Sequence, residues 1–153
     1  MFVKKYTGHA KILHMQINKS EKILIYTNVF FLIPIIIGIK NQEWSVSMFL
    51  CIFVLSSTLY HMFRKPGAEW WWHTEGRNSA QTLMLVIEIV LALILSTWSI
   101  VLLYQKSLSL LITAIVIFIP SFIMFLSTNY RRYPLYHSIW HIASAVIITL
   151  ALL

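Results

Sequence analysis

Residues 108–127 read LSLLITAIVIFIPSFIMFLS, a run of 20 residues with no charged side chain. As a helix that rises 1.5 Å per residue, such a run crosses a hydrocarbon core ~30 Å thick. A strand could satisfy its backbone in lipid only inside a closed barrel, and the run lacks the dyad alternation of barrel strands. The stretch therefore predicts a transmembrane helix, with an interruption at Pro120.

Four further apolar runs lie around this one, at residues 22–39, 44–63, 79–104 and 135–153. Of the 153 residues, 59% are hydrophobic and only 11% are charged, which leaves too little charge to cover a soluble domain. We therefore predict an all-α, polytopic membrane helix bundle of about five transmembrane helices. Residues 22–153 would form this single domain after an N-terminal segment at residues 1–21, and Pro34 predicts a kink in the first helix.

The 12 lysine and arginine residues give the chain a net charge of +7, and they lie between the apolar runs. A nucleic-acid site would instead gather them on one surface, so we expect no nucleic-acid partner. If successive helices cross the membrane, ten of these residues fall on one side (Lys4, Lys5, Lys11, Lys19, Lys22, Arg64, Lys65, Arg77, Arg131 and Arg132) and two on the other (Lys40 and Lys106). This bias predicts a cytoplasmic N-terminus in a multi-pass protein, which we expect in the cell membrane.

Four ionisable side chains stand out within the apolar runs, where charge is expensive: His61, Glu88, His137 and His141. His61 ends a helix that descends to the cytoplasmic side, while His137 and His141 begin a helix that rises from it. The i, i+4 spacing of the latter pair puts both rings on one helical face. The predicted topology therefore brings three histidines to a similar depth in the inner leaflet.

Three imidazole nitrogens with an open fourth position form the arrangement of catalytic zinc, which makes a bound water acidic. Ser57 lies four residues before His61, on the same helical face, where its hydroxyl could hold that water or stabilise developing charge. Two plainer interpretations stay open. Histidines also occur at membrane interfaces beside tyrosine and tryptophan without a metal, and Glu88 could be a hydrogen-bonding contact between helices.

These residues fall into two short motifs, Ser57–His61 (STLYH) and His137–His141 (HSIWH). Together they resemble the hallmarks of the CREST superfamily of seven-span membrane hydrolases, which has Ser-x-x-x-His in its second span and His-x-x-x-His in its last. That superfamily includes alkaline ceramidases, adiponectin and progestin receptors, and the myomaker and GPI-phospholipase branch. The longer strings SSTLYH (residues 56–61) and YHSIWHI (residues 136–142) are most similar to the myomaker-like branch.

The resemblance implies that His61, His137 and His141 bind Zn²⁺ and that Ser57 helps to position the activated water. It also implies a lipid amide or ester as the substrate.

The chain departs from the family pattern in two respects. It has five predicted spans rather than seven, and it contains no aspartate, the usual acidic residue near the third span. A glutamate would have to take that place. Glu75 stands at about the expected distance after His61 and is slightly preferred over Glu88, which would lie ~13 Å into the bilayer.

The leading functional hypothesis is a zinc-dependent membrane hydrolase, ceramidase-like or phospholipase-like, whose partner is a membrane lipid substrate. The alternative is a non-enzymatic, myomaker-like membrane protein with a structural metal site. A small transporter or haem-binding bundle that uses the same histidines is a third option. A five-helix bundle could also form a homodimer to complete its cavity, and the sequence leaves the oligomeric state open.

Overall fold

The structure is a computed structural model that describes residues 19–63, 79–126 and 132–153. Every regular element within these residues is a helix, which confirms the predicted all-α class. Most of the predicted N-terminal segment, residues 1–18, lies outside the described part. In chain order the elements are α1 (Lys19–Thr27), the 3₁₀ helix η1 (Asn28–Phe31), α2 (Leu32–Lys40), α3 (Trp44–Phe63), α4 (Ser79–Lys106), α5 (Leu108–Leu126) and α6 (Tyr133–Leu152).

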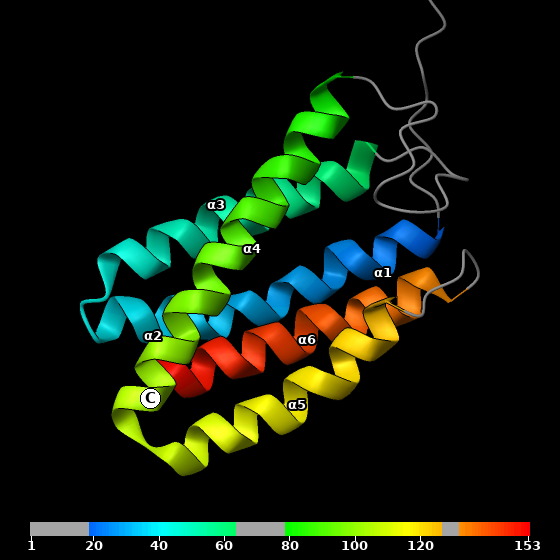
Figure 1. The fold of residues 1–153 in the computed structure, drawn as a ribbon. Coiled ribbons are helices and arrows are strands. Elements are labelled where there is room, and N and C mark those ends of the chain that lie inside the picture. The colour runs from blue at the N-terminus through cyan, green and yellow to red at the C-terminus, as the bar shows by residue number, and fades with distance from the viewer. Residues whose placement is uncertain (1–18, 64–78, 127–131) are drawn as a thin grey trace, which may run out of the picture.

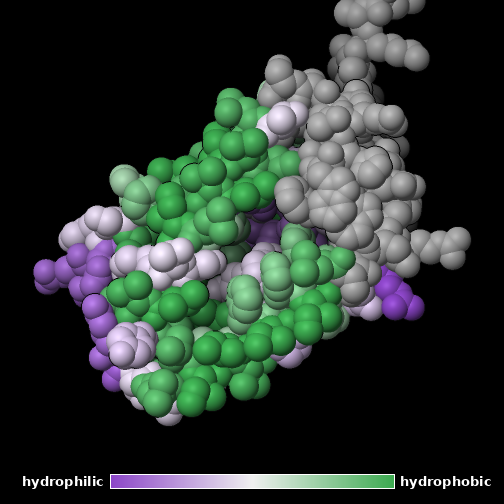
Figure 2. Space-filling model, viewed as in Figure 1, coloured by the Kyte–Doolittle hydropathy of each residue, from purple (hydrophilic) through white to green (hydrophobic). Residues whose placement is uncertain are grey.

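Five helical segments are long and apolar enough to cross a membrane: Lys22–Lys40, Trp44–Phe63, Thr82–Lys106, Leu108–Leu126 and Tyr133–Leu152. Large apolar side chains are exposed along all five. Figure 2 shows this largely hydrophobic surface over the helices, with hydrophilic residues gathered toward the ends. Apolar surface on this scale suits a hydrocarbon solvent rather than water. The chain is thus a multi-pass membrane helix bundle, as predicted.

Successive helices run in opposite directions, so the connections between them alternate between the two ends of the bundle (Figure 1). The start of α1, the end of α3 and the start of α6 share one end, while the α2–α3 and α4–α5 turns lie at the other. The division of the basic residues into ten on one side and two on the other assumes this alternation. The assignment of the basic end to the cytoplasm stays a prediction.

α6 is the central helix, because it contacts α1, η1, α2, α4 and α5. Its span is 44% buried, whereas the span of α5 is 11% buried. Only Ala114 and Ser121 of α5 are buried, so this helix packs at the periphery of the bundle and exposes most of its surface. α6 suits the centre because its buried alanines, such as Ala143, Ala145 and Ala151, let other helices approach closely.

The two prolines inside predicted spans have different effects. Pro34 lacks a backbone donor and crowds the carbonyl of Phe30, four residues earlier. Phe30 lies in η1, where the first span tightens into a 3₁₀ turn, so the distortion falls just before the expected position. The interruption expected at Pro120 is wrong, because α5 continues through it. The Ser121 hydroxyl lies 2.9 Å from the Phe118 carbonyl and 3.0 Å from the Ile117 carbonyl, whereas the carbonyl that loses its helical donor at Pro120 is that of Val116.

The turn between α2 and α3 holds the far end of α6. The side-chain amide of Asn41 donates to the Leu152 carbonyl at 2.7 Å and so satisfies a carbonyl that the helix end would leave without a partner. Gly38 approaches α3 so closely that a Cβ there would lie 2.5 Å from Oγ of Ser47. The first contact holds the end of α6 against the α2–α3 turn, and the second packs α2 closely against α3, at the end opposite to the histidines.

The apolar core lies between η1, α2, α3, α4 and α6 and consists of Phe31, Ile35, Val46, Leu50, Phe53, Leu91, Leu95, Ala145, Ile148 and Leu152. Phe31 and Phe53 meet edge-to-face with ring centroids 5.1 Å apart. Phe31 also meets the ring of His141 at 6.1 Å. The core therefore ends where the histidines begin.

Candidate metal centre

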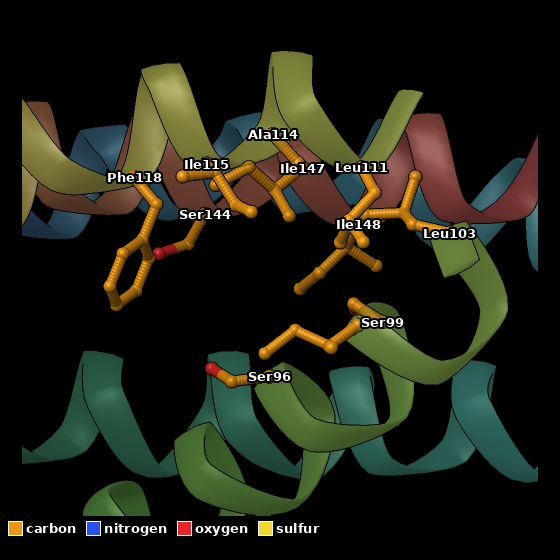
Figure 3. A pocket seen from close by; sticks show the side chains of 11 residues that line it. Ser96, Ser99, Leu103, Leu111, Ala114, Ile115, Phe118, Ser144, Ile147 and Ile148 are labelled. Atoms are coloured by element: carbon orange, nitrogen blue, oxygen red, sulfur yellow. The ribbon is translucent and has the colours of Figure 1, made fainter. Parts of the chain in front are cut away.

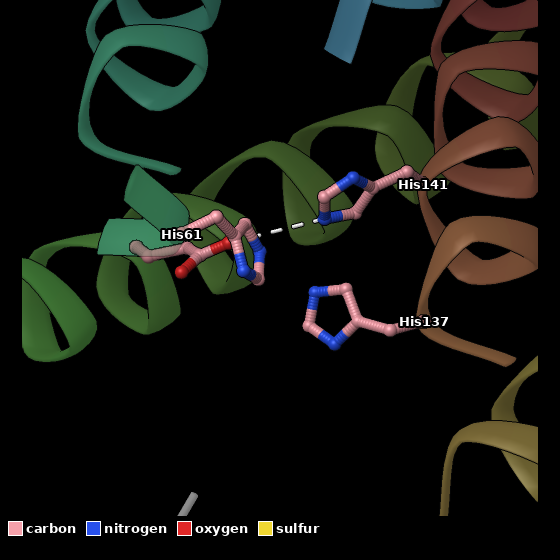
Figure 4. Close-up of side chains that lie close together, drawn as sticks. His61, His137 and His141 are labelled. Atoms are coloured by element: carbon pink, nitrogen blue, oxygen red, sulfur yellow. Dashed lines mark ion pairs between the residues drawn. The ribbon is translucent and has the colours of Figure 1, made fainter. Parts of the chain in front are cut away.

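Three buried imidazoles meet between α3 and α6 (Figure 4). His61 lies in the last turn of α3, and His137 and His141 lie one turn apart in the first half of α6. The ring centroid of His61 lies 5.0 Å from that of His137 and 5.8 Å from that of His141. The centroids of His137 and His141 are 4.6 Å apart. The structure thus brings together the three histidines that the topology places at one depth.

The helices that carry these rings do not touch through their backbones. Among the residues that the structure describes, no Cα atom of α3 lies within 8 Å of one in α6. α1, η1 and α4 each contact both helices and so frame the space between them. Because the imidazoles reach into that space from both sides, side chains alone link α3 to α6 at this level.

Glu88 of α4 completes a group of four. Its side chain is buried, and its Oε1 lies 3.9 Å from Nε2 of His141. One ligand atom from each of the four residues lies within 4.8 Å of the others. The group could therefore hold a metal ion. The other acidic candidate, Glu75, lies outside the described residues, so the structure bears on Glu88 alone.

The donor set fits a divalent metal such as zinc. Imidazole nitrogens and a carboxylate oxygen are ordinary zinc ligands, although the set by itself does not select zinc over other transition metals. Aromatic rings surround the group: Tyr60 lies 5.2 Å from His61, and Phe125 and Tyr133 lie 5.3 and 4.9 Å from His137. A carboxylate that is buried in such surroundings needs a proton or a positively charged partner. A bound cation would be such a partner.

Ser57 lies one turn before His61 in α3 and is fully buried. Other buried serines in these helices donate to a carbonyl of their own helix, as Ser56, Ser99 and Ser138 do. The Ser57 hydroxyl has no hydrogen-bond partner within the described part of the chain. A buried polar atom in that state calls for a bound water, ion or ligand, which fits the role expected for Ser57.

Two residues that the sequence analysis missed lie against the group, at the junction of α1 and η1. Oγ1 of Thr27 lies 3.2 Å from Nδ1 of His141, and Nδ2 of Asn28 donates to Oγ1 of Thr58 in α3 at 3.0 Å. Both are buried. Their only signal in the sequence is a polar pair inside an apolar span, and a search restricted to ionisable residues passes over it.

A cavity of about 100 Å³ opens between α4, α5 and α6 (Figure 3). Its walls are mostly apolar, and Ser96 and Ser144 turn their hydroxyls into it from α4 and α6. Ser144 comes three residues after His141, on the same side of the helix. The cavity therefore starts about one helical turn beyond the histidines, toward the other end of the bundle.

Comparison of the chain with protein families, with curated proteins and with solved structures finds no significant match.

Proposed function

We propose that the chain is a zinc-dependent integral-membrane hydrolase that cleaves an amide or ester bond of a lipid. The observation that carries this proposal is the convergence of His61, His137, His141 and Glu88 from three helices, with ligand atoms within 4.8 Å of one another. Several kcal/mol are needed to keep such groups away from water, so their gathering favours a function over a packing role. The motif resemblance to the CREST superfamily supports the same reaction class.

Each residue has a distinct part in the proposed chemistry. The three imidazoles would hold zinc, which when bound supplies a Lewis acid for the scissile carbonyl and for water. Glu88 lies within reach of the metal ligands and would take a proton from the attacking water and return it to the leaving group. The Ser57 hydroxyl, which has no hydrogen-bond partner among the described residues, would orient that water or the substrate carbonyl.

A lipid is the proposed substrate because of where the group lies. The histidines are buried inside membrane-spanning helices, so a substrate must approach from the bilayer or its inner surface. The cavity between α4, α5 and α6 begins one turn from His141 and is mostly apolar. A carbonyl at the histidines would therefore leave its acyl chain beside this cavity, where apolar contact favours hydrocarbon.

A second function, a structural metal site in a non-enzymatic membrane protein, is favoured by one observation. Glu88 is close enough to act as a fourth protein ligand, and four protein ligands are typical of closed, structural zinc sites. The two functions differ in what Glu88 does. As a general base it is needed for turnover but not for metal binding, whereas as a fourth ligand it is needed for metal binding.

The proposal is tested on the full chain purified in detergent. Metal content is measured by elemental analysis, and release of fatty acid from a ceramide and from a diacyl phosphatidylcholine is followed by mass spectrometry. We expect about one zinc per chain and hydrolysis of one of the two lipid classes, and we expect both to be lost in His61→Ala.

The matched control is His14→Ala, a histidine in the polar N-terminal part of the sequence, which should keep both metal and activity. Ser57→Ala should keep the metal and lose most of the turnover. Wild-type protein without stoichiometric metal would overturn the proposal. Metal without hydrolysis of either lipid class would leave the structural site as the better account.

A further inference from the structure

We propose that Thr27 is a positioning residue, which fixes the tautomer and the orientation of His141 so that its Nε2 faces the metal. This inference rests on the proposed metal centre and concerns a residue outside the motifs that suggested it. Thr27 is buried at the end of α1, and its Oγ1 lies 3.2 Å from Nδ1 of His141.

The direction of this hydrogen bond follows from the proton count of a hydroxyl. Thr27 has one hydroxyl proton, and its Oγ1 donates that proton to the Leu24 carbonyl at 2.9 Å. While that proton is donated to the Leu24 carbonyl, the same oxygen is the acceptor in its contact with His141. This arrangement assigns the ring proton of His141 to Nδ1.

A neutral imidazole protonated at Nδ1 has its lone pair on Nε2. In His141 that nitrogen faces Glu88, at 3.9 Å from Oε1, inside the group of ligand atoms. Metal-bound histidines generally donate their second N–H to an oxygen that holds the ring in place. Here the Thr27 hydroxyl is that oxygen, and the Leu24 carbonyl sets its direction.

The first span is built to hold Thr27 rigidly. α1 and η1 contact both α3 and α6, so the junction between them sits beside both metal-binding helices. The next residue, Asn28, ties the junction to α3 through its bond to Thr58. Leu24, whose carbonyl accepts from Thr27, is fully buried. Because these contacts limit movement of the junction, the acceptor stays in place before any metal arrives.

The first test measures zinc affinity by competition with a chelator, in the full chain and three variants. Thr27→Val keeps the shape and removes the oxygen, and we expect it to weaken zinc binding about 10- to 100-fold, the usual effect of losing such a partner. Thr27→Ser keeps the hydroxyl and should bind close to wild type. Thr149→Val is the matched control, because Thr149 donates to Ala145 of its own helix and lies away from the histidines.

Cobalt substitution provides a readout that general loosening of the fold would not reproduce. We expect the visible absorption band of Co²⁺ to change shape in Thr27→Val, to return in Thr27→Ser and to be unaltered in Thr149→Val. Equal zinc affinity and equal cobalt spectra in wild type and Thr27→Val would overturn the inference while leaving the metal centre intact. A wild-type chain that binds neither ion would overturn the proposed function, and this inference with it.

The second test reads the protonation in the wild-type chain itself, and a variant serves only to assign the signal. ¹⁵N NMR of histidine-labelled, zinc-free wild type, with His141→Asn used to assign the signal, reports which ring nitrogen is protonated. We expect the proton on Nδ1 of His141. A proton on Nε2 would mean that the Thr27 hydroxyl donates to the ring, and the inference would be wrong even if zinc binds.

Discussion

The two halves of α6 perform different tasks. The first half carries the buried histidines His137 and His141, which lie beside Glu88. The second half carries Ile147 and Ile148, which line the cavity shared with α4 and α5. One helix thus carries candidate metal ligands in its first half and apolar cavity-lining side chains in its second half.

This separation has a physical cause. Polar groups in a bilayer are stable only where they find partners, so they gather in a single cluster. Apolar side chains face no such demand and can line an open space that hydrocarbon fills. If the comparison is right, a change in the first half should alter metal binding or chemistry, and a change around the second half should alter only the choice of substrate.

Glu88→Gln should have the largest effect. Removal of a general base typically lowers turnover about 10²–10⁴-fold, and glutamine has nearly the same shape. We expect this loss in the lipid-hydrolysis assay while zinc content stays near one per chain. Glu43→Gln, at the exposed α2–α3 turn, is the matched control and should be neutral. A parallel loss of zinc in Glu88→Gln would make Glu88 a ligand and favour the structural site.

His137→Ala should lower zinc affinity about 10²–10³-fold, because the ~10–16 kcal/mol of binding at a structural zinc site is shared among its few ligands. Chelator competition measures the change. Ile147→Ala is made in the other half of the same helix and should bind zinc like wild type. Comparable losses in both variants would break the comparison, since they would mean that α6 responds as a single packed unit.

Ile115→Trp tests the second half from the α5 side, where Ile115 lines the cavity and is partly exposed. A larger ring there should fill space and lower the turnover of long-chain relative to short-chain lipids about tenfold, the scale of discrimination in an apolar pocket. Zinc affinity should not change. The neighbouring Val116→Trp places the same ring outside the cavity lining and should leave the chain-length ratio as it is in wild type.

Thr58→Val should have the smallest effect. It removes the acceptor of the Asn28 amide, and polar contacts between membrane helices are worth on average ~0.6 kcal/mol. The free energy of unfolding, measured in mixed micelles, should fall by about this amount. Thr113→Val, whose hydroxyl donates within exposed α5, is the control. If the free energy of unfolding fell by several kcal/mol, the polar contacts around the candidate site would be a main source of stability.

Most of the fold follows from the sequence because the bilayer restricts the choices. Length and hydropathy predict the spans, and the helix bounds differ from the prediction by only a few residues, as in α4, which extends to Lys106 rather than Tyr104. Pro120 shows the limit of a local rule. A proline removes one backbone donor and usually kinks or interrupts a helix, yet α5 continues through Pro120.

The candidate site is predictable in part. Alternating topology places His61, His137 and His141 at one depth, since depth depends only on position along each span. Which flank of the bundle a helix occupies depends on packing, so the approach of Glu88 and of Thr27 could not be derived. The slight preference for Glu75 over Glu88 rests on sequence distance and on the depth of Glu88 in the bilayer, and the structure supports a place for Glu88 in the group without testing Glu75.

The gap between the backbones of α3 and α6 has a consequence for biosynthesis. Membrane proteins are made and inserted in chain order, so α1 to α5 leave the ribosome before His137 and His141 do. Of the four candidate ligands, a nascent chain that stalls ahead of α6 offers His61 and Glu88, two donors on separate helices. If the proposed centre binds its ion, loading would therefore report that α6 has been inserted, and a truncated product would be recognisable by its lack of metal.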